Sequence, residues 1–289
     1  HVLCKVPFEE DWYRQRHCHA TYLGHPYFDE VQRQRPDQAF LDAQSSRAGR
    51  LVTILPGSRT QEVVKNLQGF LTTAAEIHRR VPDARFAIAS FNEKQAAMAR
   101  DQVAGLDFPV DVFVGRTPEL IRLSHCCLAC SGSVSLELLA HAKPTVIMYR
   151  VGWLFYTLGR TFFMKVKFIT LVNLMAAEDP FLRGGAKYDP RAASDDRVLF
   201  PEYLTYEDRS SEMAGQIVRW LTDDACYRAR VRELEALKQR YAAAGASNRA
   251  ASYILQHLRR DAALLPRPHL GLAKMHEDGK RRTKTKKSA

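Results

Sequence analysis

The chain has 289 residues, of which 46% are apolar and 26% charged, and its formal net charge at pH 7 is +11. This length and apolar share predict one large or two small soluble globular domains with a substantial core. No uncharged apolar stretch approaches the roughly 20 residues that cross a bilayer, so the sequence contains no candidate transmembrane helix.

The first 36 residues are predicted to be the last β-α-β piece of a domain that precedes the main one. Short apolar runs at 4–8 and 21–23 are the expected strands, with a helix at 9–16 between them. Because the chain begins with His1 and an apolar Val-Leu-Cys run, we expect it to start inside a domain, as a fragment or as the product of a truncated gene.

The main domain is predicted over residues 37–246, and the polar residues 32–50 are expected to form the interdomain linker. From residue 51 onward, β-branched apolar runs alternate with amphipathic helical patterns. This alternation is typical of a parallel, doubly wound α/β sheet with helices on both faces, a Rossmann-like domain. Thr117 is the expected N-cap of a helix that begins at Pro118. Strands are expected at 51–55, 84–89, 110–114, 126–130 and 145–149, and helices at 60–80, 92–103, 118–123 and 133–141.

Three helices, at 206–221, 225–243 and 248–263, are predicted after the sheet. Residues 247–265 are expected to be a C-terminal helix, and residues 266–289 a basic disordered tail. Such tails are usually just solvated, so we predict no nucleic-acid partner and keep nucleic-acid binding by the tail as an alternative. The rest of the chain is also cationic, which favours anionic ligands such as diphosphates or acidic lipid headgroups.

The six cysteines include the adjacent pair Cys126 and Cys127, which disfavours a disulfide framework and favours a reducing cytoplasm. Cys127 and Cys130 have metal-ligand spacing, but no second pair of Cys or His follows at a suitable distance. We interpret them as small side chains packed in a buried strand and predict no metal site.

The segment Leu-Pro-Gly-Ser-Arg at 55–59 lies where a strand is expected to turn into a helix. Ligands of open parallel sheets bind outside the carboxyl ends of the strands. Ser58 with Gln61 fits a capping box, which explains both residues without a ligand. Arg59 is left unexplained, and a guanidinium beside free N–H groups at a helix start makes an anion site. Gly57, Ser58 and Arg59 are therefore candidate phosphate-binding residues.

A second loop follows the strand at 126–130 and opens the next helix. Gly132 permits close backbone approach, and Ser131 and Ser133 can hydrogen-bond a diphosphate or cap the helix. Glu137 lies one turn into the helix, where a carboxylate favours the helix dipole in any protein. Its alternative role is to accept hydrogen bonds from a ribose diol. Two such loops in one domain favour a nucleotide-type ligand.

The order and spacing of these motifs resemble the lipid-A-disaccharide synthase family, from about Leu3 to Leu258. Pro-Phe-Glu at 7–9 and Gly-His-Pro at 24–26 are similar to the family's segment before its second domain. Each motif is weak alone, and the ordered set is specific. The other motifs are Leu-Pro-Gly-Ser-Arg with Glu62, Ser-Gly-Ser-x-Ser-Leu-Glu at 131–137, Lys143-Pro144, Tyr149-Arg150, and 171–174 with Asn173.

The resemblance implies a GT-B-type glycosyltransferase with two facing Rossmann-like domains, of which this chain holds the second and a remnant of the first. The donor would be UDP-2,3-diacylglucosamine and the acceptor 2,3-diacylglucosamine 1-phosphate, joined in a β-1,6 linkage with inversion and release of UDP. The reaction belongs to lipid A biosynthesis in Gram-negative bacteria. Oligomerisation is left open.

The resemblance also implies roles for individual residues. Arg59 would stabilise the UDP leaving group, Glu137 would bind the ribose, and Asn173 would line the donor pocket. Because the sequence has no Asp-x-Asp pair for a divalent ion, we expect metal-independent catalysis without a cofactor. Gly57, Ser58, Arg59, Ser131, Gly132 and Ser133 would hold the diphosphate.

Three departures from the family pattern limit these expectations. The family's general base and acceptor-binding residues lie in its N-terminal domain, so this chain is expected to bind donor without turning it over. Val172 stands where the family has proline before Asn173. An apparent insertion at about 176–199, rich in charge and Gly, separates segments that are contiguous in the family.

The stretch 151–175 is rich in aromatic residues interspersed with cations, which suits contact with a lipid surface. A core helix followed by a strand is the alternative. Because the implied substrates are acylated, we expect a protein peripheral to the cytoplasmic face of the inner membrane. The aromatics are Trp153, Phe155, Tyr156, Phe162, Phe163 and Phe168, and the cations are Arg160, Lys165 and Lys167.

Two other functions remain open from the sequence. One is a different UDP-sugar enzyme of the same architecture, such as a peptidoglycan glycosyltransferase or a UDP-N-acetylglucosamine 2-epimerase, because a fold does not fix a reaction. The other is a non-catalytic nucleotide-binding fragment.

Overall fold

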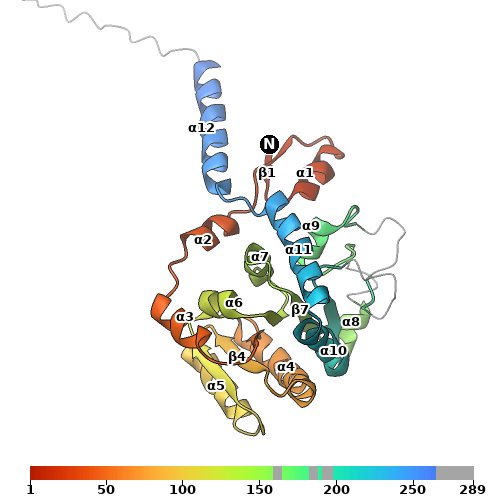
Figure 1. The fold of residues 1–289 in the computed structure, drawn as a ribbon. Coiled ribbons are helices and arrows are strands. Elements are labelled where there is room, and N and C mark those ends of the chain that lie inside the picture. Colours follow the sequence, from red (N-terminus) through yellow and green to blue (C-terminus); the bar gives the residue numbers. More distant parts are fainter. Residues whose placement is uncertain (159–164, 182–187, 191–197, 265–289) are drawn as a thin grey trace, which may run out of the picture. The chain divides into compact units, whose positions relative to one another are not determined.

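The computed structural model describes residues 1–158, 165–181, 188–190 and 198–264. The tail predicted at 266–289 and much of the insertion predicted at 176–199 lie outside the described residues. The chain divides into two compact units, residues 1–250 and 251–289. Both the sheet and the candidate site belong to the first unit (Figure 1).

The N-terminal piece is the predicted β-α-β unit, with different bounds. Strand β1 (Val2–Cys4) pairs in parallel with β2 (Ala20–Tyr22), and helix α1 (Pro7–Arg14) connects them. The helix begins earlier than predicted because Pro7 occupies its first turn and Glu9 accepts hydrogen bonds from the backbone N–H groups before it.

The predicted linker, residues 32–50, contains the end of one helix and the whole of another. Helix α2 (Tyr27–Arg33) is followed by α3 (Gln38–Ser45), whose N-cap Asp37 accepts a hydrogen bond from Phe40 N. Phe40 packs edge-on against Phe113, with ring centroids 5.1 Å apart. The linker is therefore held against the main domain.

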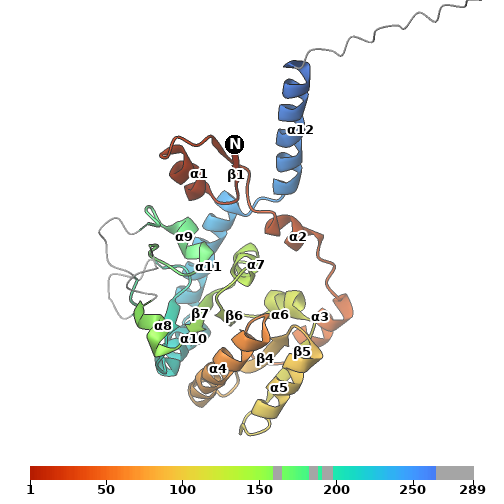
Figure 2. The same cartoon turned by 180° about the vertical axis from the view of Figure 1, so that it is seen from behind.

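The main sheet has six parallel strands in the order β5-β4-β3-β6-β7-β8 (Figure 2). Three strands have the predicted bounds, β4 and β7 differ by one residue, and β8 was not predicted. The strands are β3 (Leu51–Leu55), β4 (Arg85–Ser90), β5 (Val110–Val114), β6 (Cys126–Cys130), β7 (Thr145–Arg150) and β8 (Glu202–Thr205).

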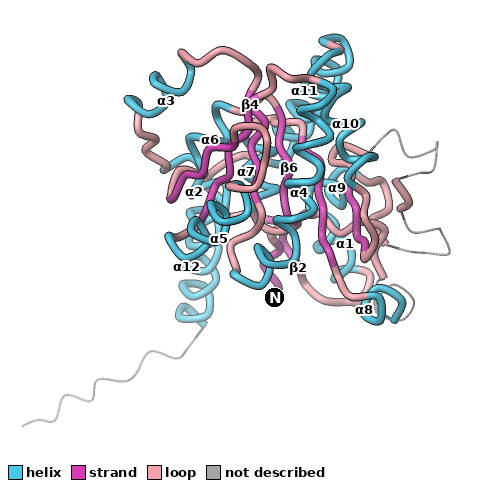
Figure 3. The backbone as a smooth tube through the Cα atoms, turned by 90° about the horizontal axis from the view of Figure 1, so that it is seen from below, coloured by secondary structure: helices cyan, strands magenta, loops and turns pink. Residues whose placement is uncertain are grey.

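Helices cover both faces of this sheet, which confirms the doubly wound α/β architecture (Figure 3). On one face, α4 (Thr60–Arg80), α5 (Glu93–Val103) and α10 (Ser210–Thr222) bury Phe70 and Trp220. The other face is covered by α6 (Thr117–Leu123), α7 (Val134–Ala140) and α11 (Asp224–Tyr241). The remaining helices are α8 (Trp153–Leu158), α9 (Leu171–Ala176) and α12 (Ala246–Leu264).

Two predicted helix starts are wrong for local reasons. The helix expected from residue 206 begins at Ser210, because the carboxylate of Asp208 accepts hydrogen bonds from the N–H and hydroxyl of Ser210. The N-cap of α6 is Arg116, so Thr117 is the first helical residue and Pro118 the second. Thr117 and Pro118 still lie at the start of the helix that follows β5.

Candidate functional site

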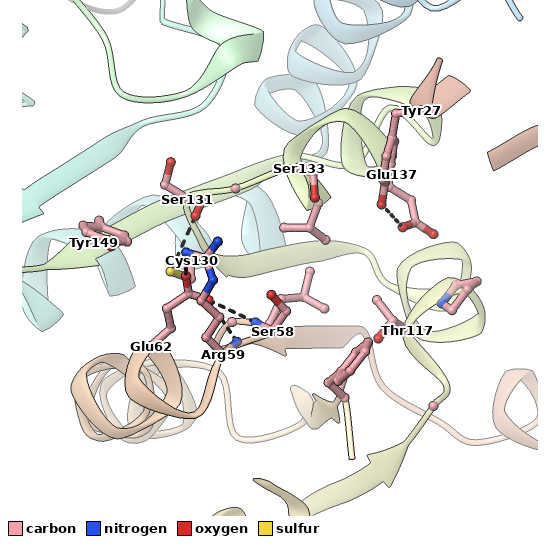
Figure 4. A pocket seen from close by; sticks show the side chains of 18 residues that line it. Tyr27, Ser58, Arg59, Glu62, Thr117, Cys130, Ser131, Ser133, Glu137 and Tyr149 are labelled. Carbon is pink, nitrogen blue, oxygen red and sulfur yellow. Dashed lines mark hydrogen bonds and ion pairs between the residues drawn. The ribbon is translucent and has the colours of Figure 1, made fainter. Parts of the chain in front are cut away.

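A cavity of about 620 Å³ opens at the carboxyl ends of four neighbouring strands (Figure 4). The loops that follow β3 and β6 both line it, so Arg59 and Gly132 share one cleft, as the sequence predicted. The lining residues that follow strands are Gly57, Ser58, Arg59 and Glu62 after β3, Phe91 after β4, Gly115, Thr117 and Pro118 after β5, and Ser131, Gly132, Ser133, Val134 and Glu137 after β6.

The loop after β3 depends on a glycine. Gly57 has φ +127°, and a Cβ built on it would lie 2.6 Å from Cβ of Glu62. Any other residue there would be strained in its backbone and would collide with Glu62. Gly57 therefore lets the loop close over the first turn of α4.

Glu62 forms the capping box of α4, which corrects the predicted pair of Ser58 and Gln61. Its carboxylate accepts hydrogen bonds from Ser58 N at 3.1 Å and from Arg59 N at 3.2 Å. The two backbone N–H groups expected to meet a phosphate are thus occupied by a carboxylate of the chain itself.

Arg59 extends from this loop at the edge of the cavity. Its side chain is 82% exposed and forms a long ion pair, 3.5 Å from Nη1 to Oε1 of Glu62. An exposed pair of this length contributes little to stability. The guanidinium can therefore turn to an anion in the cavity at small cost.

The loop after β6 lies opposite, as Figure 4 shows. Ser131 donates its hydroxyl proton to the carbonyl of Ile169 at 3.3 Å, and Ser133 caps α7 without a side-chain hydrogen bond. A Cβ built on Gly132 would meet nothing within 4 Å. This glycine is therefore not required by packing within the chain. Burial raises the pKa of the neighbouring Cys130 to about 12, so its thiol is protonated at neutral pH.

Glu137 lies in the wall of the cavity, 4% exposed, where other side chains already hold it. Oε2 accepts from the hydroxyl of Tyr27 at 3.1 Å, and Oε1 accepts from Nε2 of Gln34 at 2.7 Å. Burial and the nearby Glu137 carboxylate raise the pKa of Tyr27. Each carboxylate oxygen has a further lone pair. Glu137 is thus oriented by Tyr27 and Gln34 and can accept additional hydrogen bonds.

Asn173, expected in the donor pocket, is not among the residues that line this cavity. It is 2% exposed and bonds to the backbone of Phe200 and to the carboxylate of Glu202. The structure therefore places Asn173 in a buried network behind the cavity wall.

Sequence reasoning missed Phe91, Thr117 and Tyr27 as cavity residues. Phe91 is 69% exposed directly after β4, and Thr117 opens the helix after β5. Their position after parallel strands was the available signal. Tyr27 had no such signal, because it comes from helix α2, which precedes the main sheet.

The aromatic stretch at 151–175 divides into exposed and buried parts. Trp153 and Leu154 on α8 are each 62% exposed, whereas Phe168 is buried against Tyr188. After α8, the described residues form an isolated antiparallel bridge between Val166 and Phe181 and then helix α9, so the alternative of a core helix and a strand stays a prediction. Arg160, Phe162 and Phe163 lie outside the described residues.

Two further properties concern the described residues. None of their helices is long and apolar enough to span a membrane. Within the same residues, no group of three His, Cys, Asp or Glu side chains is placed to hold a metal ion.

Comparisons with known proteins agree on one family. A family model described as lipid-A-disaccharide synthetase matches residues 1–183. Lipid-A-disaccharide synthase of Idiomarina loihiensis is 32% identical over 182 residues, 62% of this chain and 48% of the relative. The same enzyme of Anaeromyxobacter dehalogenans is 28% identical over 260 residues, 89% of this chain and 62% of the relative. The chain thus spans 48% and 62% of the lengths of these two relatives.

Solved structures are similar at low identity. HepE of Anabaena in complex with UDP and glucose has a TM-score of 0.47 and 12% identity, covering 91% of this chain and 63% of that one. The H444N variant of the wall teichoic acid polymerase TagF has a TM-score of 0.46 and 14% identity, covering 91% of this chain and 59% of that one.

Proposed function

The chain belongs to the lipid-A-disaccharide synthetase family, and from this premise we propose that it binds a UDP-sugar donor for glycosyl transfer in lipid A biosynthesis. The donor would be UDP-2,3-diacylglucosamine and the acceptor 2,3-diacylglucosamine 1-phosphate. The observation that carries the proposal is that two strand-to-helix loops, with Arg59 and Gly132, line one cavity beside Glu137.

The cavity has the polarity that a nucleoside diphosphate requires. Arg59 on one side offers a bidentate donor for phosphate oxygens, and the Ser131–Gly132–Ser133 turn faces it from the other side. Glu137 supplies acceptors for the ribose hydroxyls. Phe91 and Pro118 offer apolar surface for the base.

Arg59 would act in the chemical step by stabilising the leaving group. Negative charge grows on the diphosphate as the bond from the sugar to UDP breaks, and a preorganised guanidinium favours that state over the bound substrate. We propose that this cation takes the place of a divalent metal ion. The expected result is that EDTA leaves UDP binding unchanged.

We propose that acceptor binding and the general base belong to the part of the relatives' length that this chain does not cover. The chain alone is then expected to bind donor and to form no disaccharide. We further propose that it lies peripherally on the cytoplasmic face of the inner membrane, with Trp153 and Leu154 in the lipid interface. Mixed vesicles with anionic lipid would test this, since Trp153→Ser should weaken vesicle binding.

Nucleotide selectivity tests the proposed function most simply. UDP should raise the melting temperature of the chain more than ADP or free pyrophosphate do, because the base and ribose contacts add to those of the diphosphate. No UDP-dependent shift in a folded sample would count against it. Disaccharide formation, assayed after adding the N-terminal domain of a relative, separates this reaction from other UDP-sugar chemistry.

A further inference from the structure

A buried carboxylate outside the cavity holds one wall of it through a chain of hydrogen bonds. Glu202, the first residue of the edge strand β8, is 3% exposed. Four neutral donors meet its carboxylate: Ile169 N at 2.6 Å, Thr170 N at 3.0 Å, the Thr170 hydroxyl at 2.6 Å and Nδ2 of Asn173 at 2.9 Å. We call Glu202, Ile169, Thr170 and Asn173 the Glu202 network.

The carboxylate of Glu202 supplies the acceptors for two backbone N–H groups, a hydroxyl and a side-chain amide. Burial raises the pKa of Glu202, and the hydrogen bonds oppose that effect. An apolar side chain would avoid the desolvation of a buried charge but would leave two backbone N–H groups unpaired. The carboxylate fixes the backbone at Ile169 and Thr170, just before α9.

The fixed backbone contacts the cavity at one point. The carbonyl of Ile169 accepts a hydrogen bond from the hydroxyl of Ser131 at 3.3 Å. The N–H of the same residue donates to Glu202. A serine hydroxyl has one proton. Ser131 thus uses its proton to anchor the loop, and the loop would bind a diphosphate through its backbone N–H groups.

From this geometry we propose that Glu202 is a positioning residue for the diphosphate-binding loop, acting through Thr170 and Ile169 on Ser131. The proposal rests on the proposed function for the identity of the ligand. It also gives Asn173 a role different from pocket lining, since its amide supports Glu202. Preorganised donors bind a charged group better than donors that must be ordered during binding.

Matched substitutions at Thr170 test the coupling in the whole chain. Thr170→Val keeps the shape of the side chain and removes the hydroxyl donor, whereas Thr170→Ser keeps the donor. Amide hydrogen exchange of the peptide containing residues 129–135, measured without ligand, should accelerate about tenfold in Thr170→Val, the effect of losing a hydrogen bond to a charged group. Thr170→Ser should exchange at the wild-type rate.

A control separates positioning from a general loss of stability. Asp208→Asn removes a carboxylate that accepts hydrogen bonds from Ser210, the first residue of α10, after strand β8. It should lower the melting temperature and leave exchange at 129–135 unchanged. If Thr170→Val is folded and its loop exchanges at the wild-type rate, the proposal is overturned.

UDP binding provides the second readout. Thr170→Val and Ser131→Ala should each lower the affinity for UDP. Because both substitutions break the same chain of contacts, the double variant should have the same UDP affinity as the single variant with the larger loss. Additive losses would also overturn the proposal. If the wild-type chain binds no UDP, the proposed function fails, while the exchange experiment still decides the role of Glu202.

Discussion

The carboxylate of Glu62 accepts a 3.1 Å hydrogen bond from the backbone N–H of Ser58 and a second from Arg59 N. The carboxylate of Glu62 therefore occupies the start of α4, where the sequence predicted a phosphate. The diphosphate must therefore contact the side chain of Arg59 and the backbone of the Ser131–Gly132–Ser133 turn. Glu62 both completes the loop and repels a second anion.

Glu62→Gln should change stability and affinity in opposite directions. The capping box weakens, which lowers the free energy of unfolding by about 1 kcal/mol. The affinity for UDP should rise about fivefold, because two like charges about 4 Å apart repel by about 1 kcal/mol in water. Urea unfolding and calorimetric titration measure the two effects. A folded variant with weaker UDP binding would show that Glu62 supports the ligand.

Arg59→Ala should reduce UDP affinity by at least tenfold, since a hydrogen bond to a charged group contributes about 1.5–3 kcal/mol. Arg59→Lys should recover only part of it, because an ammonium cannot bind phosphate bidentately. Arg79→Ala is the control, since Arg79 is similarly exposed on the last turn of the same helix and pairs with Glu76. Equal losses of UDP affinity in Arg59→Ala and Arg79→Ala would show that Arg59 acts only through the net charge of the protein.

The two loop glycines should respond differently to alanine. Gly57→Ala should destabilise the fold by about 1–3 kcal/mol, because φ is +127° and the new Cβ meets Glu62. Gly132→Ala should change stability by less than about 0.5 kcal/mol and weaken UDP binding, since its Cβ has open space in the free protein. Thermal unfolding with and without UDP separates them. Unchanged UDP affinity in Gly132→Ala would place the ligand away from this turn.

His141 should make the fold sensitive to mild acid. Burial, and then the nearby Arg122, Lys143 and Lys238, lower its pKa from 6.5 to about 4. The unfolded chain then binds more protons than the folded one between these values, so stability should rise with pH from about 4 to about 6.5 and be constant above. His141→Gln should flatten this slope in urea unfolding, and exposed His19→Gln should not. A wild-type slope in His141→Gln would assign the acid sensitivity to another group.

Local patterns predicted much of the sheet and of the cavity. Buried β-branched runs determine β3, and the loops after β3 and β6 converge because parallel strands bring their carboxyl ends to one edge. Strand β8 was missed because Glu202 and Thr205 are polar. Partners distant in the sequence make the burial of Glu202 possible.

Other errors came from competition that a pattern does not resolve. Gln61 and Glu62 were equally placed to cap α4, and the backbone at Gly57 favours Glu62. Asn173 was placed by resemblance, while its partners Phe200 and Glu202 lie beyond the insertion. Tyr27 reaches Glu137 from 110 residues away, a contact that depends on how helix α2 packs.

The position of a bound diphosphate tests the account most directly. In a crystal structure of this chain with UDP, the diphosphate should lie between the Arg59 guanidinium and the backbone N–H groups of Gly132 and Ser133, with the ribose hydroxyls at Glu137. A diphosphate that contacts neither Arg59 nor the Gly132 turn, in a folded and fully occupied crystal, would contradict it.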